Sequence, residues 1–280
     1  MRSRGNLDLR MAGTGGGSGQ VGFEERGPFL SEVRTVYCDP DARLRVLNDA
    51  GQVTVTAWEH DRIELTVERH AADEADLERL EVEFSGGPGE VVATSTSTAP
   101  TAGAWVNFGL RAPRMSALDL HSATGEILLS GFQGASRAST ASGSIRAARM
   151  SGTSTLTSVS GSILGAALEG TVFARSASGG VSLHGTLMGA HRVETASGDI
   201  EVDGVDGSID ARSASGDIAV TGRLSGRCSL RTGSGDIRVE LLRGSDVEVQ
   251  TTGRQEDHPH GVGVLLIETT SGEIQLNHEA

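Results

Sequence analysis

The stretch Arg212-Ser-Ala-Ser-Gly-Asp-Ile-Ala-Val220 decides the fold of this chain, because copies of it recur from Asp119 to Ala280. With the glycine of its Ser/Thr-Gly-Asp/Glu/Ser step as a marker, nine copies follow one another at intervals of 18 or 19 residues. The markers are Gly125, Gly143, Gly161, Gly179, Gly198, Gly216, Gly235, Gly253 and Gly272. A fixed period of this length is typical of stacked supersecondary units.

Each copy contains two short alternating segments. Apolar residues stand two and four positions after the marker, as Ile218 and Val220 do, and seven and five positions before it, as Ile209 and Ala211 do. Such alternation predicts strands with one buried face. A Leu-x-Gly step, as at Leu224-Ser-Gly226, separates one copy from the next. Each unit therefore reads as strand, Ser-Gly corner, strand, Leu-x-Gly corner.

A two-strand unit this short cannot bury its own apolar face, but stacked copies can. We therefore expect an all-β, single-stranded β-helix-like solenoid with coils of 18–19 residues. Serines before the markers, such as Ser197 and Ser215, would stack into a hydroxyl ladder. The alternative, an antiparallel meander, gains nothing from identical residues at a full period.

Three regions are expected. Residues 1–30 are rich in Gly and Ser and are predicted to be disordered. Residues 31–118 read as an irregular N-terminal β region capping the stack, with one short helix over residues 71–80. Residues 119–280 form the regular solenoid, with residues 254–261 as a loop bulging from the copy around Gly253. Gly51 precedes Gly125 by 74 residues, about four periods, which indicates early irregular coils.

Composition excludes several classes of protein. The net charge is -13, which disfavours nucleic acid and anionic membrane surfaces as partners. All 24 basic residues are arginine, which excludes lysine chemistry. We find no apolar stretch long enough to insert in a membrane and no recognisable signal peptide, so a cytoplasmic location is expected. Cys38 and Cys228 make no disulfide framework, and Cys228 and His191 fall in inward columns as expected core residues.

Two columns of charged residues are the ligand-facing candidates. Asp199, Asp217 and Asp236 occupy one position in neighbouring coils, flanked in that column by Glu126 and Glu273. Stacked carboxylates could bind calcium. Capping of the turns is the simpler interpretation.

The second column alternates in charge. Its members are Arg175, Glu194, Arg212, Arg231 and Glu268. It predicts a surface ion ladder in which each exposed pair contributes about 0–1 kcal/mol. The functional alternative is a strip that binds an acidic or sugar ligand.

Asp257, His258 and His260 form the one metal-like cluster, and a plain surface loop is the simpler interpretation. We expect no cofactor and no catalytic residues, because the Gly-Ser pairs belong to the repeat rather than to a nucleophile elbow.

The run Val106-Asn-Phe-Gly-Leu-Arg-Ala-Pro-Arg-Met115, then Leu118-Asp-Leu-His-Ser-Ala-Thr-Gly-Glu-Ile127, then repeated Ser-Ala-Ser-Gly-Asp-Ile-x-Val, resembles the toast-rack family. Members are bacterial β-strand-repeat domains of unknown function, often labelled putative adhesins. The resemblance covers residues 33–276. It implies a β-helix-like stack and a link to cell-envelope stress, and it carries no catalytic residues.

The leading hypothesis is a non-enzymatic scaffold or interaction module whose partner is a protein or an envelope polymer. A second is a self-assembling filament former, because uncapped solenoid ends can stack. A rival of another class is a carbohydrate-active β-helix enzyme, which needs paired carboxylates in a groove. With two Trp, one Tyr and six Phe, the chain has few aromatic platforms for sugars.

Overall fold

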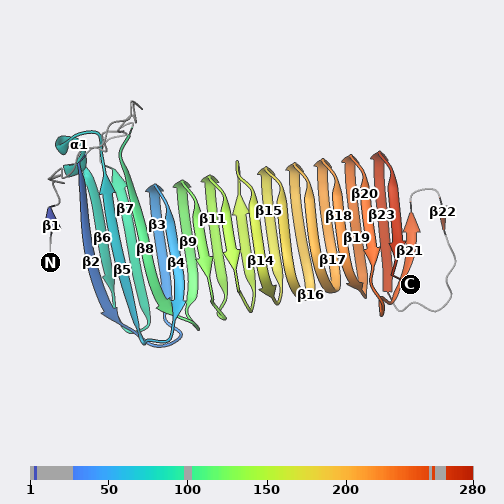
Figure 1. Ribbon diagram of the computed structural model, residues 1–280, viewed down its shortest axis with the longest axis horizontal. Helices are drawn as coiled ribbons and strands as arrows, with labels where there is room; N and C mark the ends of the chain where they lie inside the picture. Colours follow the sequence, from blue (N-terminus) through green and yellow to red (C-terminus); the bar gives the residue numbers. More distant parts are fainter. Residues whose placement is uncertain (1–2, 5–27, 98–102, 252–253, 256–262, 280) are drawn as a thin grey trace, which may run out of the picture.

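The computed structural model of the chain describes residues 3–4, 28–97, 103–251, 254–255 and 263–279. Nearly all of its elements are strands, which lie side by side in a long rack (Figure 1). The predicted all-β solenoid is confirmed. One helix, α1 (Glu74–Glu78), lies where a short helix was expected, and Asp73 caps it by accepting a hydrogen bond from the Asp76 amide at 2.8 Å.

The strands form one continuous sheet folded into two walls that meet at the Ser-Gly corner. The pre-corner wall contains β3 (Arg43–Ala50), β9 (Ala117–Thr124), β11 (Ser136–Ser142), β13 (Ser154–Ser158), β15 (Val172–Ser178), β19 (Arg227–Ser234) and β23 (Gly263–Ser271). The post-corner wall contains β4 (Val53–Trp58), β10 (Ile127–Ser130), β12 (Ile145–Ala148), β14 (Ile163–Glu169), β18 (Ile218–Leu224), β20 (Ile237–Leu241) and β24 (Ile274–His278). The long strands β16 (Val181–Ser197) and β17 (Ile200–Ser215) run through the second corner and belong to both walls.

Each strand pairs in parallel with its counterpart in the neighbouring coil. Ile200 lies beside Ile218, and Glu194 lies beside Arg212. From β9 to β24 every pairing is parallel except one short pair at the C-terminal end, so the described residues exclude the antiparallel meander. The coils are joined by backbone hydrogen bonds between like positions of the repeat.

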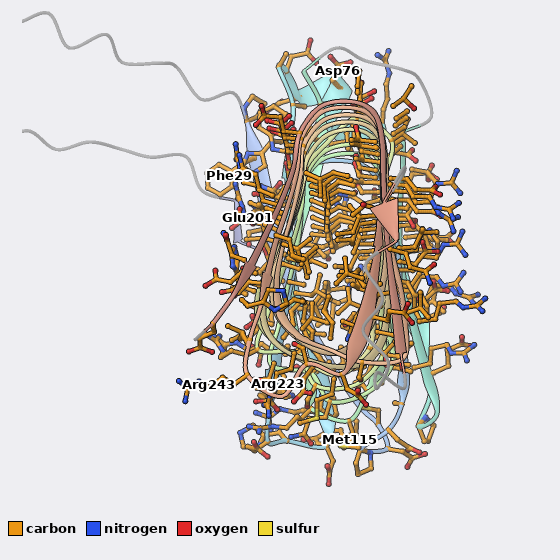
Figure 2. The ribbon with its side chains drawn as sticks, turned by 90° about the vertical axis from the view of Figure 1, so that its right-hand side faces the viewer. Phe29, Asp76, Met115, Glu201, Arg223 and Arg243 are labelled. Carbon is orange, nitrogen blue, oxygen red and sulfur yellow. The ribbon has the colours of Figure 1, made fainter. Side chains whose placement is uncertain are left out.

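The core is the narrow space between the two walls, filled by aliphatic side chains (Figure 2). One inward column is buried along most of the rod and consists of Val53, Ile127, Ile145, Ile163, Val181, Ile200, Ile218 and Ile237. Cys228 and His191 are also buried in the pre-corner wall, as expected, and both cysteines are free thiols. Each coil adds the same few side chains, so burial depends on its neighbours.

The Ser-Gly corner is an interlocked column of glycines. Gly216 has a φ of +143°, and a Cβ added to it would lie 2.2 Å from the carbonyl oxygen of Gly198 in the preceding coil. Only glycine allows this approach. The same contact with the preceding glycine recurs at Gly125, Gly143, Gly161, Gly179, Gly198, Gly235 and Gly272.

A buried row of hydroxyls supports that corner. The Ser213 hydroxyl donates a hydrogen bond to the carbonyl of Gly198 at 3.1 Å, one coil away. Thr140, Ser158, Ser176, Thr195, Thr232 and Thr269 make the equivalent bond. The predicted serine ladder is in register, since Ser197 lies beside Ser215, but its side chains are exposed. The hydroxyls that donate hydrogen bonds to the preceding coil belong to residues two positions earlier, such as Ser213.

The Leu-x-Gly corner is less regular. The pairing register shifts between Ala166 and Leu168, and again between His184 and Leu187. Arg149 and Ala167 near this corner have φ values of +52° and +51°. The extra residues of the longer copies therefore lie at this corner, because an odd insertion within a strand would turn its side chains to the other face.

At the N-terminal end antiparallel strands complete the rack. β2 (Phe29–Tyr37), β5 (Arg62–His70) and β8 (Trp105–Pro113) pair in an antiparallel manner, as do β6 (Leu80–Gly86) and β7 (Glu90–Ser97), and β1 (Ser3–Arg4) pairs with β2. β8 then lies parallel to β4, and β7 parallel to β3.

The 74 residues between Gly51 and Gly125, about four periods, indicated irregular coils between these two glycines. That prediction is wrong. Gly51 is the direct neighbour of Gly125 in the glycine column. The intervening residues instead build the end of the rack outside β3 and β4.

The C-terminal end corrects the predicted order of copies. β23 pairs with β19 on one side and with β21 (Val247–Thr251) on the other, so the later strand lies between the two earlier ones. Gly272 therefore contacts Gly235, and the copy around Gly253 is not a coil between them. β22 (Arg254–Gln255) pairs antiparallel with β21. The rest of the predicted bulging loop and most of residues 1–30 lie outside the described residues.

Candidate functional site

The alternating column forms an ion ladder on the outer face of the pre-corner wall. Arg175 Nε and Arg212 Nη1 each lie 3.9 Å from a Glu194 carboxylate oxygen, and Arg231 Nε lies 3.0 Å from Glu268 Oε2. Arg192, two residues before Glu194 on β16, donates to it at 2.7 Å. The structure thus brings together the residues that the sequence placed in one column.

Two hollows lie along this ladder. The first has a volume of about 370 Å³ and is lined by Arg175, Glu194, Arg212 and the small residues beside them. The second has a volume of about 520 Å³ and lies over β17, β19, β23 and β21. Its lining comprises Asp210, Arg212, Arg227, Cys228, Ser229, Arg231, Gln250, Val264 and Leu266. Arg212 is shared, so the hollows adjoin on one face.

Inside the larger hollow some polar groups are satisfied and others are not. Arg212 Nη2 lies 2.9 Å from Asp210 Oδ2. The other oxygen of that carboxylate, Oδ1, and the Ser229 hydroxyl are buried with no hydrogen-bond partner among the described residues. Arg227 is exposed and makes no ion pair within that part of the chain.

The acidic column does a structural task. The Asp217 amide donates to Asp199 Oδ1 at 2.8 Å, the Asp236 amide to Asp217 Oδ1 at 2.8 Å, and the Glu273 amide to Asp236 Oδ1 at 2.9 Å. Each carboxylate caps the backbone of the next coil, which is the turn-capping arrangement weighed above. Nothing in this geometry gathers several carboxylates around one cation.

The metal-like cluster Asp257, His258 and His260 lies outside the described residues. Within residues 28–97, 103–251 and 263–279, no group of three or more His, Cys, Asp or Glu side chains could hold a metal ion.

One serine, histidine and aspartate row resembles a hydrolase triad in composition. Ser139 Oγ lies 2.5 Å from His121 Nδ1, and His121 Nε2 lies 2.9 Å from Asp119 Oδ1. In a triad the serine contacts Nε2 and the carboxylate contacts Nδ1, so the order here is reversed. β11 also pairs with a strand on each side, so its backbone amides donate to neighbouring strands and do not form an oxyanion hole.

Asp119 in this row is held ionised. Burial alone would raise the pKa of its carboxyl, but His121 and Arg45 outweigh it and hold the pKa below its usual value. Arg45 Nε lies 3.2 Å from Asp119 Oδ2. The row is an ion and hydrogen-bond ladder across three coils.

Of the polar residues that line the larger hollow, the sequence reasoning named Arg212 and Arg231 as ligand-facing and missed Asp210, Arg227, Ser229 and Gln250. Arg227 could have been found, because it stands four positions before Arg231 and so points to the same face. Gln250 carried no signal, since β21 lies out of chain order beyond β23.

No helix in the described ranges has the length and apolar character that crossing a bilayer requires. A comparison with curated proteins finds no match. Among solved structures, a "putative lipid binding protein" from Parabacteroides distasonis is 12% identical, with a TM-score of 0.51 over 89% of this chain and 97% of the other. A "putative adhesin" from Bacteroides fragilis is 11% identical, with a TM-score of 0.48 over 88% and 96%.

At these identities the first structure supports the fold alone. Residues 169–277 match the family described as Toastrack DUF4097, and this match covers the coils that carry the arginine ladder and both hollows. The resemblance stated from the Ser-Ala-Ser-Gly-Asp-Ile repeats is thereby confirmed over residues 169–277, the part of the chain that matches the toast-rack family.

Proposed function

We propose that this protein is a non-enzymatic, adhesin-like interaction module that presents the outer face of its pre-corner wall to an acidic group on a protein or envelope polymer. One observation carries the proposal: Arg175, Arg212 and Arg231 line two adjoining hollows on a chain whose net charge is -13. Arginine binds carboxylate, sulfate and phosphate through paired hydrogen bonds.

The rod supplies what such a face needs. Its walls are fixed by the glycine column and by parallel pairing, so the arginines stay at a set spacing without ordering a loop on binding. Preorganisation lowers the entropy cost of association. A chain of this acidity would repel acidic ligands elsewhere on its surface, so local arginine surplus also gives selectivity.

A matched pair of triple variants tests the proposal. Arg175→Gln, Arg212→Gln and Arg231→Gln together remove the charges of the ladder. Arg146→Gln, Arg223→Gln and Arg238→Gln remove three ion-paired arginines from the post-corner wall. Binding to immobilised acidic envelope polymer, measured at low and moderate salt, should fall by roughly tenfold or more in the first variant only. Equal retention of both variants would contradict the proposal.

Self-association is the second candidate, favoured by the C-terminal end. Among the described residues β24 pairs only with β20, and its Ile274 and Leu276 side chains are half-buried. An open strand edge beside apolar side chains is a pairing surface. Sedimentation of the purified protein across concentrations tests this, and a monomer throughout would contradict it.

The expected lack of catalysis and the cytoplasmic location stay predictions with simple tests. Incubation with the bound polymer should leave its chain length unchanged, whereas shortening would favour the carbohydrate-active alternative. Cell fractionation probed with an antibody would locate the protein.

A further inference from the structure

We infer that the larger hollow binds one acidic sugar unit, with its carboxylate or sulfate held by Arg227 and Arg231 and its hydroxyls held by Asp210, Ser229 and Gln250. The inference rests on the proposed function, because it names the ligand class of the same wall.

The charge in the hollow is the first step. Its lining has three arginines and one aspartate, a surplus of two positive charges. Arg212 and Arg231 already contact Asp210 and Glu268, whereas Arg227 has no ion-pair partner in the described residues. An anionic group on a ligand would supply the partner that Arg227 lacks among these residues.

The unsatisfied polar atoms are the second step. Asp210 Oδ1 accepts hydrogen bonds, and the Ser229 hydroxyl both donates and accepts. Both atoms are buried without a partner among the described residues, and both belong to residues that line the hollow. A hydrogen bond left unmade at a buried polar atom costs free energy, so a ligand whose hydroxyls meet these two atoms, once the side chains turn toward the hollow, gains by satisfying them. A sulfate ion has no hydrogen to donate to a carboxylate.

The apolar part of the lining is the third step. Val264 and Leu266 from β23 are half-buried and face the same hollow. They offer a surface for the C–H face of a sugar ring. A volume of about 520 Å³ falls in the range of small-ligand sites, which is about 300–1,000 Å³. The hollow thus offers arginines for a negative charge, polar atoms for hydroxyls and an apolar surface for a ring. This combination fits an acidic sugar better than a simple anion or a neutral sugar.

Calorimetric titration of the full chain tests the inference with three probes: trigalacturonic acid, the neutral trisaccharide maltotriose, and sodium sulfate. We expect the acidic trisaccharide to bind roughly tenfold or more tightly than either control, because only it meets both the arginines and the hydroxyl partners. If sulfate binds as tightly as the acidic trisaccharide, the claim that the ligand is a sugar is wrong. If maltotriose binds equally tightly, the claim that the ligand must be acidic is wrong.

Variants locate the site. Arg227→Gln should weaken the acidic trisaccharide by about tenfold. Ser229→Ala should weaken it by a few fold without changing the response to sulfate. The matched control Arg238→Gln, on the opposite wall, should leave it unchanged.

The two proposals fail in different ways. If polymer binding depends on the ladder triple variant while Arg227→Gln has no effect, the hollow is wrong and the interaction face stands. If neither the polymer nor the trisaccharide binds, both are wrong.

Discussion

The two corners of the coils differ in their regularity along the rod, although both contain glycine. At the Ser-Gly corner each glycine lies against the glycine of the previous coil, and buried hydroxyls join the coils. At the Leu-x-Gly corner the contacts vary from coil to coil. A Cβ added to Gly207 would lie 2.2 Å from the Gly189 carbonyl oxygen, whereas one added to Gly226 would meet nothing nearer than 3.9 Å, and the pairing register shifts in neighbouring coils. One corner sets the alignment of the coils, and the other absorbs differences in length.

The contrast explains why the repeat tolerates copies of 18 and of 19 residues. A one-residue change at the Leu-x-Gly corner is taken up before the strand enters the wall. The same change at the Ser-Gly corner would move both the glycine column and the inward columns out of register.

The largest expected effect breaks the tight corner. Gly216→Ala places a methyl group 2.2 Å from a backbone carbonyl, at a φ of +143°, and we expect a loss of about 3–5 kcal/mol or failure to fold. Gly226→Ala has φ +72° with open space around it and should cost about 1 kcal/mol. Urea unfolding followed by circular dichroism measures both, and equal losses would refute the distinction between the corners.

A smaller effect tests the buried hydroxyl row. Ser213→Ala removes the donor to the Gly198 carbonyl and should cost about 1–2 kcal/mol. Ser215→Ala, two residues later on the exposed side of β17, should stay within about 0.5 kcal/mol. If thermal unfolding ranks the two variants the other way round, the exposed serine ladder joins the coils instead.

His191, just after the looser corner, should make stability depend on pH. Burial lowers the pKa of its imidazole, which packs in the column of Val172 and Ile209 and accepts a hydrogen bond from the Val172 amide. Protonation therefore favours the unfolded chain. Stability should fall as pH drops below the unfolded value of about 6.5 and continue to fall toward the folded value.

The control for that prediction is His191→Val, which keeps the site apolar. Unfolding between pH 7.5 and 5 should show a shallower decline in the variant, by up to about 1.4 kcal/mol per pH unit for one proton. Parallel curves for the two proteins would show that His191 is not responsible.

The smallest effect relieves strain at the looser corner. Ala167 has φ +51°, so Ala167→Gly should stabilise by up to about 1 kcal/mol, whereas Ala166→Gly in β14 should destabilise by a similar amount. Melting temperatures of the two variants should move in opposite directions. A lower melting temperature for Ala167→Gly would mean that the corner is not strained there.

Sequence reasoning reached the parts of the fold that repeat. The columns of Ile200 and Ile218 fixed the inward faces, and the marker glycines located the tight corner. It could not place β21 outside β23, because spacing along a chain does not tell which neighbour a strand selects. At the candidate site, sequence reasoning found the ion ladder through Arg212 but did not find Gln250. Gln250 lines the hollow only because β21 pairs with the later strand β23.

The central claim is that successive tight corners are one strand spacing apart in a single parallel column. Spin labels at the exposed Thr124 paired with Ser234, and at Thr124 paired with Ser271, test it directly by electron–electron dipolar distances. We predict about 29 Å for the first pair and about 34 Å for the second, because Ser271 lies one coil beyond Ser234. An increase of about 10 Å between the two pairs, as copies stacked in strict chain order would give, or no increase at all, would contradict the account.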